Sequence, residues 1–76
     1  MNPEYVLVPI EHLHLPEVVI DQEYVARLIK DFNPDRMGPI YAKKRRDGTY
    51  MVTDGVHRAV AAAAAGEQAV RVYPHA

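Results

Sequence analysis

The residues of this chain best suited to chemistry lie together between Thr53 and Arg58, where an apolar segment meets an alanine-rich one. A strand that passes through Gly55 into a helix leaves the first helical amides without acceptors, and the peptide dipoles add partial positive charge there. Such an end binds anions, above all phosphate. Arg58 would add a planar fork of hydrogen-bond donors, and His57 would add an imidazole.

The spacing predicts that Asp54 caps this helix, that Gly55 and Val56 form its first turn, and that His57 and Arg58 lie beside a bound oxyanion. The same residue types also have an ordinary structural interpretation. Asp-Gly is a common cap and turn, His57 could bond a neighbouring carbonyl group, and Arg58 could lie in solvent. The residue types alone leave both interpretations open.

The elements that must hold this segment in place follow from the apolar pattern. Residues 5–10 are expected to form a strand that ends near Pro9, and residues 21–32 a helix capped by Asp21. Apolar residues at helical spacing are expected to place this helix in the core: Val25, Leu28, Ile29 and Phe32. Residues 40–52 are expected to form a hairpin that turns at Asp47-Gly48. Residues 59–65 are expected to form a helix that Gly66 ends, and residues 69–73 a last strand that Pro74 stops.

Two groups of residues outside this segment were considered for binding. His12 and His14 in an expected loop have the i, i+2 spacing of metal ligands, but no third ligand is near, and we predict no metal site. A set of cations invites a nucleic-acid interpretation: Arg36, Lys43, Lys44, Arg45 and Arg46. Because side chains alternate across a strand, at most two of the last four can face one ligand, and a solvated hairpin tip explains them as well.

Length and composition set limits on the rest. With 76 residues the chain has room for one domain, residues 1–76, which would bury about 60% of its unfolded surface, so that a homodimer would add useful burial. No apolar run approaches the roughly 20 residues that span a bilayer, and residues 1–4 do not begin a signal peptide. The chain has no cysteine, which makes the cytoplasm the expected compartment. A net charge of −1 argues against strong non-specific binding of nucleic acid.

The order of these segments resembles the ParB/sulfiredoxin superfamily over residues 6–73. Residues 50–62 resemble its apolar strand, its Gly-x-His-Arg elbow and its alanine-rich helix, and Gly38-Pro39-Ile40 and residues 65–72 resemble its strand entry and its final turn and strand. The resemblance implies a compact α+β domain with a small mixed sheet and two main helices. It also implies a phosphate-binding corner: Asp54, Gly55, Val56, His57 and Arg58.

The departures from the family pattern narrow the expected function. Sulfiredoxins carry a catalytic cysteine where this chain has Val56, which excludes sulfinic acid repair. Partition-type ParB proteins have adjacent arginines in the elbow and append a helix-turn-helix domain and a dimerisation tail, which do not fit after Val72. The elbow is more similar to those of small phage-encoded members and of relatives that act as nucleotide-dependent free-serine kinases.

These observations favour a regulatory or partition-related module that binds a nucleotide or phosphate at the elbow. Two alternatives stay open. The basic hairpin could bind DNA, or the domain could be a phosphotransferase or nucleotide hydrolase, in which Asp54 or Glu23 assists and Mg²⁺ bridges the phosphates.

Overall fold

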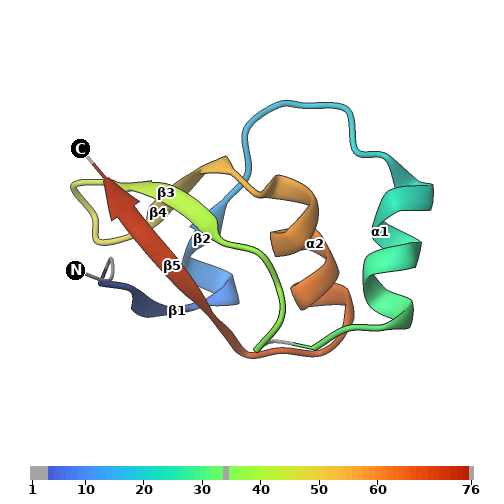
Figure 1. The fold of residues 1–76 in the computed structure, drawn as a ribbon. Coiled ribbons are helices and arrows are strands. Elements are labelled where there is room, and N and C mark those ends of the chain that lie inside the picture. The colour runs from blue at the N-terminus through green and yellow to red at the C-terminus, as the bar shows by residue number, and fades with distance from the viewer. Residues whose placement is uncertain (1–3, 34, 76) are drawn as a thin grey trace.

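The computed structural model describes residues 4–33 and 35–75 (Figure 1). One five-stranded sheet has the order β1-β5-β3-β4-β2. Its strands are β1 (Val6–Pro9), β2 (Leu13–His14), β3 (Ile40–Lys44), β4 (Tyr50–Asp54) and β5 (Ala69–His75), and the helices are α1 (Gln22–Lys30) and α2 (Val56–Ala64). Because β1/β5 and β3/β4 pair antiparallel and β3/β5 and β2/β4 pair parallel, the sheet is mixed, which confirms the predicted α+β architecture.

Both helices lie on one side of the sheet (Figure 1). The core forms between the sheet and α2 from small apolar side chains: Val8, Ile40, Ala42, Val52, Ala59, Ala62, Val70 and Val72. Alanine suits this face of α2, because its single methyl group lets the helix backbone lie close to the strands. Helix α2 ends at Ala64, and Gly66, predicted to end it, follows the C-cap Ala65 with a φ of 89°. The amides of Gly66 and Glu67 return to the carbonyl groups of Ala63 and Ala62, as in a Schellman motif.

Helix α1 begins as predicted, because the Asp21 carboxylate accepts a hydrogen bond from the Tyr24 amide at 3.1 Å. The helix ends at Lys30 instead of reaching residue 32. The predicted core stripe is wrong in part: Val25 is 6% exposed, but Ile29 is 36% exposed, and Leu28 and Phe32 are half-buried. Since α1 packs mainly against the short side chains of α2 and not on the sheet, only the centre of its apolar face is covered.

The hairpin of β3 and β4 turns at Gly48, whose φ of 89° matches the expected left-handed geometry. Its Arg45 carbonyl accepts from the Gly48 amide at 3.1 Å, and the Asp47 carboxylate accepts from the hydroxyl and the amide of Thr49 at 2.6 and 2.9 Å. These bonds from Thr49 lower the pKa of Asp47 below its usual 3.8. Further along, a bulge interrupts the pairing: Tyr41 faces Asp54, and Ala42 faces Val52, so Thr53 is the extra residue of β4.

Two segments differ from the predicted loops and ends. His12 closes a short 3-10 helix, Ile10–His12, and His14 belongs to β2, so neither lies in the expected loop. Strand β5 continues through Pro74, where it pairs with Ala42 of β3, while the pairing with β1 covers only residues 69–72. A proline is tolerated there because its missing N–H can face the side on which no described residue pairs with β5.

None of the helices in the described part is long and apolar enough to cross a membrane. Residues 1–3, on which the expectation about a signal peptide partly rests, lie outside the described residues.

Candidate functional site

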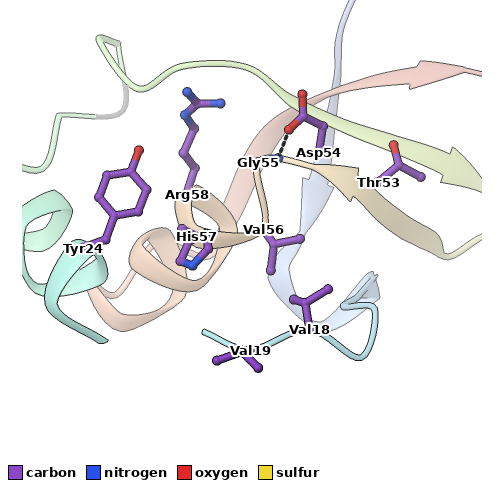
Figure 2. A pocket seen from close by; sticks show the side chains of 9 residues that line it. All are labelled: Val18, Val19, Tyr24, Thr53, Asp54, Gly55, Val56, His57 and Arg58. Atoms are coloured by element: carbon purple, nitrogen blue, oxygen red, sulfur yellow. Dashed lines mark hydrogen bonds between the residues drawn. The ribbon is translucent and has the colours of Figure 1, made fainter. Parts of the chain in front are cut away.

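The elbow between β4 and α2 is built on Gly55. This glycine is the N-cap of α2, with φ 85° and ψ 28°, and α2 begins at Val56 with no side-chain hydrogen bond to its cap. The predicted capping by Asp54 is therefore wrong. Because Asp54 still ends β4 and the left-handed Gly55 intervenes, the Asp54 carboxylate reaches only the Gly55 amide, at 2.9 Å (Figure 2). The first amides of α2 are left for another acceptor.

Glycine is required at position 55 for a second reason. A Cβ atom there would lie 2.8 Å from the Pro39 carbonyl oxygen and 3.2 Å from the Ile40 Cα atom. The elbow is thus pressed against the start of β3, which fixes the direction in which α2 leaves the sheet.

Arg58 crosses from α2 to the segment before β3. Its Nη1 atom donates to the Pro39 carbonyl oxygen at 3.1 Å, and its guanidinium group lies where a Cβ atom on Gly38 would come within 2.6 Å. The side chain is half-buried and not free in solvent. Since a guanidinium has five N–H donors, this contact leaves donors for an anion, and no carboxylate in the described residues pairs with Arg58.

His57 has a role that the spacing did not suggest. Its Nε2 atom accepts a hydrogen bond from the Asp21 amide at 3.0 Å, and its ring lies 5.3 Å from that of Tyr24. The accepting Nε2 implies a neutral ring with its proton on Nδ1. His57 bonds neither a carbonyl nor an oxyanion through this atom; it joins the first turn of α2 to the start of α1. Figure 2 shows the side chains of His57 and Arg58 leaving that turn in different directions.

A pocket of about 310 Å³ opens at this elbow (Figure 2). Its lining joins the predicted residues to a loop and to α1: Val18, Val19, Tyr24, Thr53, Asp54, Gly55, Val56, His57 and Arg58. The loop side chains are unusually open, since Val18 is 51% and Val19 93% exposed. Val18, Val19 and Tyr24 are not predicted from the sequence, because no local pattern places the loop before α1 against the elbow. Two adjacent valines before a helix cap are the one available signal.

The predicted cations do not form one cluster. Arg36 precedes β3 and lines a neighbouring pocket of about 260 Å³ that shares Tyr24 and Arg58 with the first. The others lie at the far end of β3, Lys43 and Lys44 in the strand and Arg45 and Arg46 in the turn, and all are exposed. The DNA-binding role of these residues stays a prediction.

Metal and phosphotransfer chemistry also stay untested. Among residues 4–33 and 35–75, no group of three or more His, Cys, Asp or Glu side chains is arranged to hold a metal ion. Of the two acids considered for catalysis, Asp54 lines the pocket, whereas Glu23 lies in the first turn of α1 and does not.

Comparison with solved structures identifies the architecture. The chain aligns with a C-terminally truncated SbnI from Staphylococcus aureus at a TM-score of 0.82 and 28% identity, over 95% of this chain and 30% of that one. It aligns with sulfiredoxin from Arabidopsis thaliana at a TM-score of 0.75 and 28% identity, over 96% of this chain and 85% of that one. The chain has the ParB/sulfiredoxin-like fold.

The same fold occurs in the chromosome-partitioning protein ParB of Caulobacter crescentus, C-terminally truncated and complexed with CTP-gamma-S. That protein aligns at a TM-score of 0.79 and 24% identity, over 95% of this chain and 44% of ParB. This chain therefore spans less than half of the SbnI and ParB chains that share its ParB/sulfiredoxin-like fold. No protein-family model matches the sequence, and no curated protein matches it.

Proposed function

We propose that the elbow binds the phosphate groups of a nucleotide. The observation that carries this proposal is the pocket at the start of α2, where a helix N-terminus without a side-chain cap and the half-buried Arg58 converge. Helix amides and an arginine that line one open volume suit a phosphate, which offers several acceptor oxygens. The Arg58–Pro39 bond supports this role because it holds the guanidinium in place before a ligand arrives.

A nucleotide suits the pocket better than inorganic phosphate alone. Val18, Val19 and Tyr24 give the pocket an apolar wall on the side away from the strand end, and such a wall fits a sugar or base. The ParB neighbour complexed with CTP-gamma-S supports a nucleotide in this fold. Mg²⁺ would enter with the phosphates, and Asp54 is the carboxylate of the pocket that could approach it. In this proposal the domain is a regulatory or partition-related module.

Isothermal titration with CTP, ATP, GTP and phosphate, each with and without Mg²⁺, tests the proposal. We expect at least one nucleotide to bind, and Arg58→Ala to lose about 1.5 to 3 kcal/mol of binding free energy, the scale of a charge-assisted hydrogen bond. Arg58→Lys keeps the charge but not the planar group of donors, so its affinity should lie between those of the wild type and Arg58→Ala. Arg27→Ala, which removes the same side chain from the last turn of α1, is the matched control. Equal affinity of wild type and Arg58→Ala would place any ligand elsewhere.

Because Arg58 also bonds Pro39, each variant needs its own unfolding curve. A variant that is folded at the titration temperature and has lost affinity supports the proposal. Release of phosphate from a nucleotide, abolished by Asp54→Asn, would instead make the domain an enzyme; phosphoserine formed from added serine would identify a phosphotransferase.

DNA binding through the hairpin is a second candidate, favoured by the exposure of its four adjacent cations. A ParB complexed to the centromeric parS site aligns at a TM-score of 0.74 and 25% identity, over 93% of this chain and 38% of ParB. Replacing Lys43, Lys44, Arg45 and Arg46 by glutamine should flatten the salt dependence of duplex binding if they contact phosphates. A mobility shift that is unchanged in this variant would exclude the hairpin.

A further inference from the structure

The face of the sheet that points away from α2 carries large side chains of a different kind from the core. Along β3 and β5 the buried residues alternate with the residues of this face, as the pleat requires. We call this surface the outer face and define it by Tyr5, Leu7, Tyr41, Lys43, Arg71 and Tyr73. Figure 1 shows both helices on the opposite side, so neither helix covers it.

Tyrosines form a row across the outer face. Tyr41 and Tyr73 face each other in the parallel register of β3 and β5, with ring centroids 5.7 Å apart. Tyr5, directly before β1, lies with its ring 6.1 Å from that of Tyr73. The two outer rings are open to solvent, Tyr5 at 47% and Tyr41 at 38% exposure. Tyr73, between them, is half-buried.

Cations stand on both sides of this row. Arg71 faces Leu7 in the pairing of β5 with β1, and its guanidinium lies 5.4 Å from the centre of the Tyr5 ring. An ion pair with Asp35 at 3.0 Å holds Arg71 in position. On the other side, Lys43 lies two residues beyond Tyr41 on the same face of β3. A hollow of about 270 Å³ lies on the Arg71 side of the row and is lined by Tyr41, Tyr73, Arg71 and Asp35.

We propose that the outer face binds single-stranded nucleic acid by stacking bases on the tyrosine row. Every base has a π-face, and aromatic side chains with cations beside them bind single strands with little regard to sequence. The rings are inclined to one another, by 39° between Tyr41 and Tyr73 and by 65° between Tyr5 and Tyr73, so bases would stack on single exposed ring faces, above all that of Tyr41. Arg71 and Lys43 lie on either side of the row, where a passing backbone would place phosphates.

The charges of the outer face and the access of bases to its rings favour single-stranded nucleic acid over a second copy of this chain and over a nucleic-acid duplex. A second copy of the chain, packed on the outer face by two-fold symmetry, would take Lys43 and the Arg71–Asp35 ion pair out of water together with the tyrosines, which is costly for charged groups. A duplex keeps its bases stacked inside the helix, so no base would be free to stack on the tyrosine rings. No residue of the tyrosine row lines the pocket at the elbow, and the two surfaces adjoin where Tyr41 pairs with Asp54.

Fluorescence anisotropy with labelled dT12 and U12, against the same dT12 annealed to its complement, tests this proposal at low salt. We expect both single strands to bind, and the duplex to bind at least tenfold more weakly. Tyr41→Leu keeps apolar bulk but removes the ring, and should weaken single-strand binding roughly five- to 150-fold, the range for loss of stacking on one base. Tyr41→Phe keeps the ring and should bind as the wild type does.

Salt titrations test the cations separately. Lys43→Gln should reduce the slope of log Kd against log salt by about one phosphate contact, and Lys30→Gln, the same change in the last turn of α1, should leave it unaltered. Equal binding of duplex and single strand, equal binding by Tyr41→Leu and wild type, or displacement of the oligonucleotide by an excess of mononucleotide would overturn the proposal. So would sedimentation of a wild-type dimer that Tyr41→Leu dissociates, because the outer face would then be a dimer interface.

Discussion

At the scale of single residues, three glycines share one backbone conformation in different surroundings. Gly48, Gly55 and Gly66 have φ values of 89°, 85° and 89°, but only Gly55 has neighbours within 4 Å of a Cβ position. Gly48→Ala should therefore lose about 1 kcal/mol of unfolding free energy, the cost of a left-handed alanine. Gly55→Ala should lose clearly more, about 2 to 4 kcal/mol, because it adds the contact with Pro39. Urea unfolding of the two variants measures the difference in unfolding free energy. Equal losses would show that the backbone around Gly55 and Pro39 can shift to make room for the added methyl group.

Residues 54–58, predicted from the sequence as a binding site, all line the elbow pocket, but the contacts of Asp54 and His57 were not predicted, and the binding role of the segment stays a prediction. The position of the elbow follows from a strand, a glycine and an alanine run in succession. The roles of Asp54 and His57 depend on features that no local spacing reveals: the left-handed turn at Gly55 and the arrival of Asp21, 36 positions earlier, against the His57 ring. Arg58 was placed correctly at the elbow, and its anchor on Pro39 comes from packing alone.

At the scale of elements, α1 depends on α2 for its place in the fold. The hydrogen bond from the Asp21 amide to His57 and the ring contact between His57 and Tyr24 tie its first turn down. We expect His57→Ala to lose about 1 kcal/mol and to speed hydrogen exchange in α1 more than in the sheet. His14→Ala, on the edge strand β2, is the control. If hydrogen exchange became faster to the same extent in α1 and β5, α1 would not unfold separately from the sheet.

The hairpin of β3 and β4 should respond to acid through Asp47. Hydrogen bonds from the Thr49 hydroxyl and amide lower the pKa of Asp47 below 3.8, so its carboxylate stabilises the fold at every pH above that value. The contribution is lost as the pH falls further, through the lowered pKa of the folded state. Carbon-13 titration of the Asp47 carboxyl should show this lowered value. In Asp47→Asn, the unfolding free energy should change less between pH 5 and pH 2.5 than in the wild type.

Element types were predicted better than element ends. Two helices, the hairpin and the first and last strands were predicted because each has a clear period or turn residue. Strand β2 was missed, because Leu13 and His14 are too few to show a period and pair only through tertiary contact with β4. The sequence predicts that Pro74 stops the last strand, yet β5 passes through it, beyond the residues that pair with β1 in the described part of the chain.

At the scale of the whole molecule, stability rests on a small core of aliphatic side chains. Val72 is fully buried in the middle of the sheet, whereas Val19 is 93% exposed. We expect Val72→Ala to lose about 2 to 4 kcal/mol, through lost burial and an unfilled cavity, and Val19→Ala to change stability by less than about 0.5 kcal/mol. Thermal and urea unfolding of both variants provide the comparison. A loss of unfolding free energy below 1 kcal/mol for Val72→Ala would show that neighbouring core side chains move in to fill the cavity.

The place of β5 in the sheet also determines when the domain can fold during its synthesis. The strand lies between β1 and β3, and it is the partner to which β1 is paired in the described sheet, although some 60 residues separate them along the chain. During synthesis β1 leaves the ribosome first and has no strand to pair with until residues 69–75 follow. The sheet cannot close on a partly made chain, so the domain must fold after these residues emerge, and until then the apolar residues of β1 are open to chaperones.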